Sequence, residues 1–158
     1  MIIQTSISSP IDDISIQATE KGVSYVGFYP VVEHPHTSLE YVTNKAVLIC
    51  AAQLNEYFAK KRTTFDVPLD TSGTAFQQSV WQALLTVPFG QSQTYGYIAN
   101  QLNNPKAVRA VGAANGKNPI SIIVPCHRII GANAKLTGYA GGLDRKRWLL
   151  KHEGLNLY

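Results

Sequence analysis

The sequence has few cysteines, no long hydrophobic run and, in its second half, few acidic residues. Its 158 residues include two cysteines, Cys50 and Cys126, which are too few for a disulfide framework. We expect no signal peptide, and the sequence contains no apolar stretch long enough to cross a membrane. We therefore expect a cytoplasmic protein. Apolar residues make up 45% of the chain, which is enough to build a packed core in one domain or in two lobes.

The net charge of +4 arises from the second half of the chain, where acidic residues are scarce. Residues 1–90 carry five Lys and Arg against eight Asp and Glu, a net charge of −3. Residues 91–158 carry nine against two, a net charge of +7. A polyanionic partner such as nucleic acid would explain this asymmetry. A solvated basic face without a partner would also explain it, and charge alone favours this simpler interpretation.

The N-terminal part predicts a small sheet followed by a helix. Residues 14–19 and 22–28 alternate in polarity or are rich in β-branched and aromatic residues, which is typical of strands. A proline-broken loop over 30–37 separates them from a predicted helix over 38–61. The apolar face of that helix has helical spacing and consists of Val47, Cys50, Ala51, Leu54 and Phe58. We expect Cys50 to be a buried packing residue, and residues 64–73 to form a linker.

The C-terminal part predicts several short helices. Thr74 and Gln77 have the spacing of a capping box, and the helix that follows carries Phe76, Val80, Leu84 and Val87 on one face. Two short helices over 94–103, capped by Thr94, and 106–116 form a candidate helix-turn-helix. Residues 120–124 predict a short buried strand, residues 138–142 a loop, and residues 145–154 a basic amphipathic helix.

The predicted helix over 106–116 is unusually bare. Apart from Arg109, its surface consists mainly of small residues, namely Ala107, Ala110, Gly112, Ala113 and Ala114. Such a helix lets its backbone approach another surface closely. That surface is either a second helix or the groove of a nucleic acid, and the sequence pattern does not decide between them.

Cys126 ends an apolar run and precedes a His-Arg pair in the stretch IIVPCHRII. It could be a packing residue, half of a disulfide, a metal ligand or a nucleophile. The chain offers too few Cys and His partners for a zinc site, so we expect no metal. A nucleophilic thiolate needs a lowered pKa, for which His127 and Arg128 are neighbours of the right charge. From these residues alone, nucleophile and core residue are equally favoured.

Four separated motifs resemble one known family. The run RAVGAANGKNPISIIVPCHRIIG over 109–131 contains a PCHR motif, and GYAGG over 138–142 and WLLKHEG over 148–154 follow it in the right order. They are similar to the O6-alkylguanine-DNA alkyltransferases, the methylated-DNA–protein-cysteine methyltransferases, in their short bacterial form. The resemblance covers residues 74–154 well and residues 1–73 only in the order of strand and helix.

The resemblance implies a catalytic role for four residues. Cys126 would be the thiolate that takes the alkyl group from guanine O6 and keeps it, which makes the protein a single-use enzyme without a cofactor. His127 would deprotonate Cys126 through a water, and Glu153 would hold the histidine in the right tautomer. Tyr95 would donate a proton toward guanine N3.

The resemblance also implies how the base would be bound. The backbone amide of Ala140 would bind O6, and the backbone carbonyls of Cys126 and Ile129 would accept from the exocyclic amine. Tyr139 would form a wall of the pocket. Asn118 would tie the helix-turn-helix to the turn at the active site, and Arg128 would be a structural anchor.

For DNA, the resemblance implies binding of a duplex through the minor groove with the alkylated guanine flipped out. Arg109 would enter the base stack, and Ala107, Ala110, Gly112 and Ala113 would let the helix fit the groove. Lys106, Lys117, Lys135 and the cluster Arg145–Arg147 would contact phosphates. We expect a monomer on this basis, with cooperative binding along DNA left open, and no membrane association.

The predicted fold class is α+β. An N-terminal lobe, residues 1–73, would contain a small antiparallel sheet and a helix and would be structural. A mostly helical lobe, residues 74–158, would contain the helix-turn-helix, bind DNA and accept the alkyl group. The resemblance implies repair of O6-alkylguanine, and of O4-alkylthymine, by direct transfer to Cys126. A non-enzymatic alkylguanine-binding protein of the alkyltransferase-like type, or a cysteine hydrolase, is the alternative.

Overall fold

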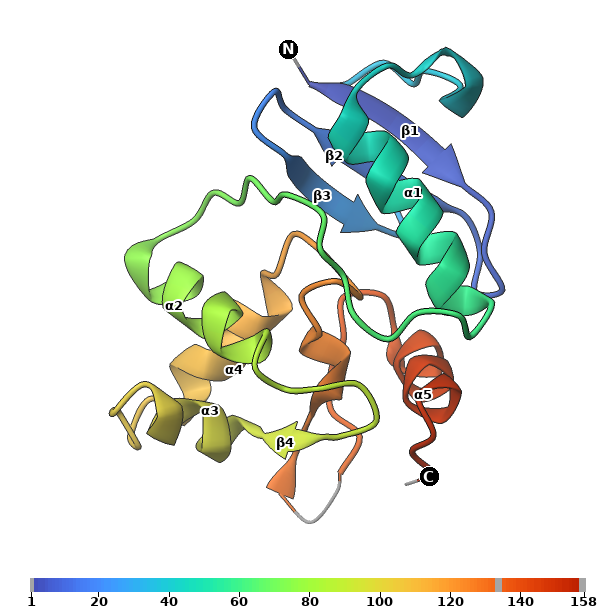
Figure 1. Ribbon diagram of the computed structural model, residues 1–158. Coiled ribbons are helices and arrows are strands. Elements are labelled where there is room, and N and C mark those ends of the chain that lie inside the picture. The colour runs from blue at the N-terminus through green and yellow to red at the C-terminus, as the bar shows by residue number, and fades with distance from the viewer. Residues whose placement is uncertain (1, 133–134, 157–158) are drawn as a thin grey trace. The chain divides into compact units, whose positions relative to one another are not determined.

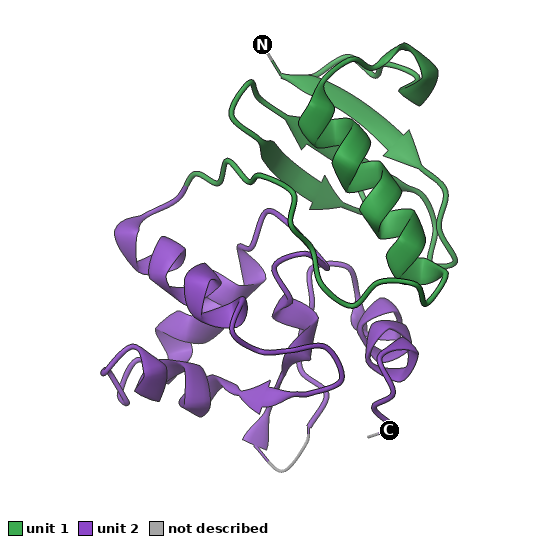
Figure 2. Cartoon of the chain, viewed as in Figure 1, with its two compact units in different colours: residues 1–72 green, residues 73–158 purple. Residues whose placement is uncertain are grey.

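A computed structural model describes residues 2–132 and 135–156 and is mixed α+β, as the sequence predicts (Figure 1). The chain divides into two compact units, residues 1–72 and residues 73–158 (Figure 2). This division falls one residue from the boundary expected from the sequence. No helix in the described ranges is long and apolar enough to span a membrane.

The first unit is a three-stranded antiparallel sheet with one long helix. Its strands are β1 (Ile3–Ile7), β2 (Ile14–Ala18) and β3 (Val23–Gly27), and they lie side by side in the order of the sequence. Helix α1 (Lys45–Phe58) lies along one face of the sheet and contacts β2 and β3 (Figure 1). The two strands expected from the sequence are confirmed.

Strand β1 was not expected, because its interior carries polar residues. Gln4 and Thr5 are buried there. The Gln4 side chain is paired, since it donates to the carbonyls of Val31 and His34 and accepts from the amide of Val31. The strand therefore uses a buried amide, rather than an apolar side chain, to hold the loop over 30–37.

Helix α1 begins later than predicted. The segment 38–44 contains only a 3-10 turn, η1 (Leu39–Tyr41), and the helix is capped by Asn44, whose side chain accepts from the amide of Val47. A capping side chain satisfies an amide that has no partner in the first turn, which fixes the start. The predicted apolar face is buried except for its last member. Phe58 is only half-buried, and Tyr57 takes the buried position instead.

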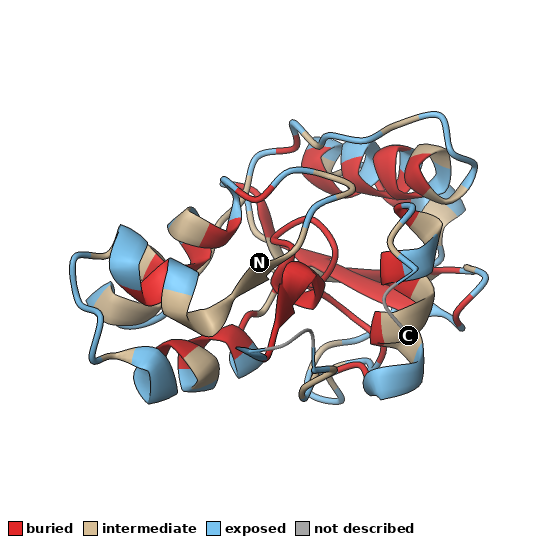
Figure 3. Ribbon diagram, turned by 90° about the horizontal axis from the view of Figure 1, so that it is seen from below, coloured by how far each residue is buried: buried red, intermediate tan, exposed pale blue. Residues whose placement is uncertain are grey.

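Cys50 lies on the buried face of α1. It is a free thiol without solvent exposure, and burial raises its pKa to about 12. The expected packing role is confirmed. The alternation of buried and exposed residues along the helices is visible in Figure 3.

The second unit contains four helices among the described residues. They are α2 (Ala75–Leu84), α3 (Tyr95–Gln101), α4 (Val108–Gly116) and α5 (Leu143–His152). The capping box of Thr74 and Gln77 and the cap by Thr94 are both present, as predicted. Val80, Leu84 and Val87 are buried, whereas Phe76 is only half-buried. Helices α3 and α4 pack against each other and form the expected helix pair.

A short parallel pairing fixes the start of α3 relative to the segment after Cys126. Strand β4 (Gln93–Thr94) pairs with β5 (Ile129–Ile130), with Thr94 opposite Ile130. Tyr95 comes directly after β4, and Gly131 comes directly after β5. The residues that follow the two strands therefore lie side by side.

The predicted strand over 120–124 is wrong. Residues 121–124 form a buried turn, in which Ile122 has φ of 73° and the Val124 amide donates to the Ile120 carbonyl over 3.1 Å. An apolar run shows that a segment is buried, but it does not show whether the backbone is extended or turned. The turn ends at Pro125 and leads into the 3-10 helix η2 (Cys126–Arg128).

Candidate active site

Asn118 holds the buried turn that precedes Cys126. Its side-chain amide donates to the carbonyl of Val124 over 2.8 Å and to that of Ile120 over 3.3 Å, and its side-chain oxygen accepts from the Ile120 amide over 3.0 Å. A turn buried from water needs partners for its backbone groups, and one asparagine just past α4 supplies several of them. Asn118 thus links the helix pair to the turn that carries Cys126.

Cys126 is buried and protonated at rest. Burial raises the pKa of its thiol to about 11, although a hydrogen bond from Asn118 and the charge of Lys146 act in the opposite direction. The expected lowering of this pKa by Arg128 fails for a physical reason. The guanidinium of Arg128 forms a buried ion pair with the Glu153 carboxylate, whose negative charge offsets the effect of Arg128 on the thiol.

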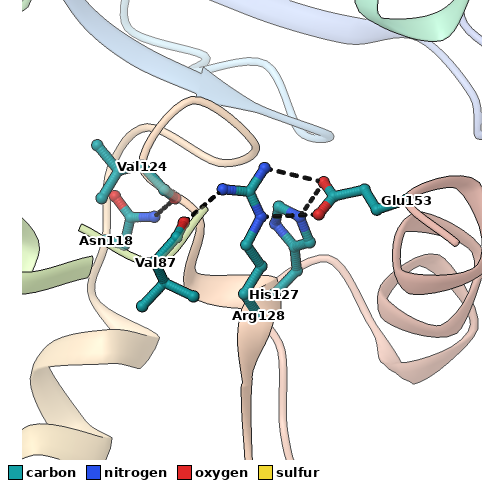
Figure 4. Close-up of polar contacts among 6 residues, drawn as sticks. All are labelled: Val87, Asn118, Val124, His127, Arg128 and Glu153. Carbon is teal, nitrogen blue, oxygen red and sulfur yellow. Dashed lines mark hydrogen bonds and ion pairs between the residues drawn. The ribbon is translucent and has the colours of Figure 1, made fainter. Parts of the chain in front are cut away.

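The carboxylate of Glu153 is hydrogen-bonded to the side chains of His127 and Arg128, which are neighbours in the sequence (Figure 4). His127 Nε2 lies 2.7 Å from Oε2, Arg128 Nε donates to Oε1 over 2.7 Å, and Arg128 Nη2 donates to Oε2 over 3.1 Å. Burial alone would raise the pKa of Glu153. The charge of Arg128 and the hydrogen bonds from His127 and Arg128 outweigh burial and hold that pKa far below its usual range. The carboxylate is therefore ionised.

The ionised carboxylate fixes the tautomer of His127. Burial lowers the pKa of this histidine, against the opposing effect of Glu153, so the ring is neutral near pH 7. A carboxylate can only accept, so the single ring proton must lie on Nε2. Nδ1 is buried and has no hydrogen-bond partner in the ranges 2–132 and 135–156. This nitrogen is consequently an acceptor that can take up a proton.

Arg128 anchors the active-site segment to a distant part of the chain. Its Nη1 donates to the Val87 carbonyl over 2.7 Å, and its guanidinium lies 5.9 Å from the ring centroid of Phe89. Together with the Glu153 contacts, these hold η2 between the segment after α2 and the end of α5. Arg128 has the geometry of a structural residue, as expected.

Lys146 is a site residue that sequence reasoning missed. It was grouped with Arg145 and Arg147 as a phosphate contact, but its side chain is buried. Its ammonium donates to the carbonyl of Ile129 over 2.6 Å and to that of Thr137 over 3.1 Å, and burial lowers its pKa to about 8. The available signal was its helical spacing of three and four residues from Leu149 and Leu150, which are also buried.

Four further residues were assigned to the base pocket from the sequence, and their surroundings differ. The Tyr95 hydroxyl is 2.7 Å from Thr137 Oγ1. Burial and the nearby Cys126 raise the pKa of Tyr139 well above its usual value. Ile129 is buried, and its carbonyl already accepts from Lys146. Ala140 is exposed.

Two further backbone contacts bear on the pocket. The Cys126 carbonyl accepts a long hydrogen bond from the Asn115 side chain, at 3.4 Å, and it also accepts from the Ile129 amide. Both carbonyls expected to receive the exocyclic amine of guanine thus have protein donors. A carbonyl oxygen has two lone pairs, so the Cys126 carbonyl would receive the amine in exchange for the long hydrogen bond from Asn115.

The surface of α4 is as bare as its sequence suggests, with one exception. Arg109, Ala110 and Ala113 are exposed, whereas Ala107 and Gly112 are partly exposed. Ala114 faces the interior, where its carbonyl accepts from the Trp81 indole over 2.9 Å. It does not belong to the small-residue surface.

Comparison with known proteins assigns both units to the same family. The family model for the DNA-binding domain of 6-O-methylguanine DNA methyltransferase matches residues 75–155. The model for the ribonuclease-like domain of 6-O-methylguanine DNA methyltransferase matches residues 2–71. The chain belongs to the 6-O-methylguanine DNA methyltransferase family. The resemblance based on PCHR, GYAGG and WLLKHEG is confirmed, and it extends to the N-terminal part, where the sequence motifs were weak.

Relatives of this family are similar along nearly the whole chain. The methylated-DNA–protein-cysteine methyltransferase of Methanosarcina acetivorans is 52% identical over 147 residues, which cover 92% of this chain and 94% of the relative. The crystal structure of Mycobacterium tuberculosis O6-methylguanine methyltransferase has a TM-score of 0.86 at 46% identity, covering 97% of this chain and 93% of that one. The Mycobacterium tuberculosis OGT in complex with DNA has a TM-score of 0.85 at 47% identity, covering 95% and 91%.

Replacing Glu153 by Gln tests the buried carboxylate. The variant leaves the charge of Arg128 buried without its counterion, so we expect it to lose roughly 3 kcal/mol of unfolding free energy at neutral pH. Because the pKa of Glu153 is lowered in the fold, its contribution is present above the unfolded value of about 4.3 and is lost as the pH falls through the folded value. Denaturant titrations of both proteins at several pH values should therefore converge in acid.

The matched control is Asp144→Asn, which removes an exposed carboxylate from the start of α5, the helix that leads into Glu153. It should leave the free energy of unfolding close to that of the wild type, because an exposed ion pair contributes little. A Glu153→Gln protein as stable as the wild type at neutral pH would contradict the importance of the carboxylate.

Proposed function

We propose that this protein repairs DNA by transferring an alkyl group from guanine O6 to its own Cys126. The observation that carries the proposal is the arrangement around His127. Its Nε2 is held by an ionised Glu153 at 2.7 Å, and its Nδ1 is left as a buried acceptor beside the residue that bears the thiol. Membership of the methyltransferase family, and the names of relatives as methylated-DNA–protein-cysteine methyltransferases, support the proposal.

In the proposed reaction, the thiol of Cys126 first gives its proton to His127 Nδ1 through a water. A protonated resting thiol, with a pKa near 11, requires such a base because only the thiolate is a good nucleophile. The sulfur then attacks the alkyl carbon, the S–C bond forms and the bond between carbon and O6 breaks. Guanine leaves as an anion, which takes a proton at N3 from Tyr95, and the proton held by His127 restores the phenol through solvent.

The product explains why the enzyme would act once. A thioether on Cys126 has no good leaving group, so neither water nor a neighbouring side chain would displace the alkyl group. This disfavours a cysteine hydrolase, which must regenerate its thiol. The non-enzymatic alkylguanine-binding alternative is disfavoured by Cys126 itself, since such a protein needs no acceptor thiol. We extend the proposed substrates to O4-alkylthymine.

The DNA partner is proposed from α4 and from a relative. The Mycobacterium tuberculosis OGT that this chain resembles is known in complex with DNA. The exposed small residues of α4 suit the minor groove, which is only about 6 Å wide. The target oxygen is inaccessible in a stacked duplex, so the base must be flipped out, and the exposed Arg109 would take its place in the stack. Phosphate contacts would come from Lys106, Lys117, Lys135, Arg145 and Arg147.

The bound base would meet the groups around Cys126. The Ala140 amide would donate to O6, Tyr139 would form a wall, and the carbonyls of Cys126 and Ile129 would accept from the exocyclic amine. In this proposal residues 74–158 bind DNA and accept the alkyl group as a monomer, and residues 1–73 are structural. Two free cysteines in the described chain suit a reducing cytoplasm.

The transfer itself can be followed by mass spectrometry. Mixing the protein with a duplex that contains one O6-methylguanine should add one methyl group, on the peptide that contains Cys126, and the reaction should stop at one methyl per protein. Cys50→Ser is the matched control and should react like the wild type, because Cys50 is buried in the other unit. Methyl transfer by Cys126→Ser at an undiminished rate, or continued turnover, would refute the mechanism.

Replacing Arg109 by Ala separates base flipping from binding. Flipping costs a few kcal/mol of unstacking, so the variant should react about tenfold more slowly in single-turnover experiments. Its affinity for the duplex should fall by less than about threefold, because phosphate contacts dominate binding. Lys106→Ala should instead weaken binding to the duplex and leave the transfer rate of the bound complex nearly unchanged. The dependence of its affinity on salt concentration should fall by about one counterion. An unchanged rate for Arg109→Ala would count against the proposed role.

A further inference from the structure

Thr137 makes three contacts that bring together different parts of the site. Its hydroxyl oxygen lies 2.7 Å from the hydroxyl of Tyr95. Its backbone carbonyl accepts from the buried ammonium of Lys146 at 3.1 Å, and the same ammonium donates to the Ile129 carbonyl at 2.6 Å. Its methyl group faces Gly131 so closely that a Cβ built on the glycine would come within 2.9 Å of it.

These contacts leave the Thr137 side chain little freedom to rotate. The methyl group is confined by Gly131, which directly follows β5, and the backbone is held by Lys146. The hydroxyl then points at Tyr95, which directly follows β4, the partner strand of β5. The position of the phenol is therefore set both by its own helix and by a hydroxyl from the segment after Cys126.

The pair of hydroxyl groups constrains where the protons lie. A phenol has one proton. If Tyr95 donates that proton to the base, it cannot donate it to Thr137 as well, so the Thr137 hydroxyl must be the donor between them. A hydrogen bond received at the phenol oxygen also polarises its O–H bond, because chains of hydrogen bonds strengthen one another.

We infer that Thr137 is a positioning residue that donates to the Tyr95 phenol oxygen and so directs the phenol proton to N3 of the flipped guanine. The inference rests on the proposed function, in which Tyr95 protonates the leaving base. Thr137 itself does not touch the reacting atoms. Its effect on the rate therefore depends on Tyr95 and on the presence of a nitrogen at position 3 of the base.

Thr137→Val is the first test, because valine keeps the shape and the methyl group but has no hydroxyl. Loss of one hydrogen bond should slow single-turnover methyl transfer about threefold to tenfold. The dissociation constant for the alkylated duplex should stay unchanged. Thr137→Ser, which keeps the hydroxyl, should react within about twofold of the wild type, and thermal unfolding checks that each variant is folded. If the valine variant is unfolded, Thr137→Ala replaces it.

The decisive comparison uses a duplex in which the alkylated guanine carries CH in place of N3. This base cannot receive the phenol proton, so the wild type and Thr137→Val should transfer its methyl group at the same rate. In a protein that already carries Tyr95→Phe, Thr137→Val should likewise cause no further decrease in the rate of methyl transfer. A slower valine variant with both bases would show a merely structural role, and an equally fast one with both would overturn the inference directly.

The wild type with the ordinary alkylated base distinguishes this inference from the proposed function. If the wild type leaves Cys126 unmodified, the proposed function fails and the role of Thr137 fails with it. If the wild type is methylated but the variants do not show the expected pattern, only the role of Thr137 is wrong.

Discussion

The site depends on one buried carboxylate. Glu153 lies directly after α5, yet it accepts from both side chains of the His127–Arg128 pair in η2. Two different properties follow from the same contact. Arg128, held by Glu153, also donates to the Val87 carbonyl and so connects η2 to the segment after α2. The contact between Glu153 and His127 determines which ring nitrogen of the histidine keeps its proton. A buried ion pair contributes little net stability, but breaking one is costly, so loss of Glu153 would weaken both the fold and the chemistry.

Burial keeps the thiol of Cys126 neutral at rest. With a pKa of about 11, the cysteine is a poor target for oxidants, which attack thiolates. In the proposed mechanism, the proton would move to His127 only after the substrate has bound. For a protein proposed to react once, an acceptor that is quiet at rest is an advantage, because each side reaction would consume a whole molecule. The buried ammonium of Lys146 stabilises the thiolate once it forms.

Local patterns in the sequence predicted the fold where the determining contacts are local. The caps at Thr74 and Thr94 lie within one turn of the amides they satisfy. Such local signals were enough to predict the helix pair of α3 and α4. The start of α1 was missed because the residues before Asn44 are compatible with a helix, and the Pro-broken loop leading into them is held by Gln4 from another strand. The PCHR motif identified Cys126 and its partners by resemblance. Burial of Lys146 and the pairing of Thr137 with Tyr95 depend on tertiary contacts that no local pattern contains.

The protonation state of His127 is the central claim, and nitrogen NMR of the imidazole measures it directly. In protein labelled with ¹⁵N at histidine, at pH 7 and without DNA, we expect a neutral ring with a protonated, pyrrole-type Nε2 and an unprotonated, pyridine-type Nδ1. Glu153→Gln should remove the preference for this tautomer, because an amide can also donate. A wild-type ring protonated on Nδ1 alone, or a doubly protonated imidazolium, would contradict the account, because neither could take the proton from Cys126.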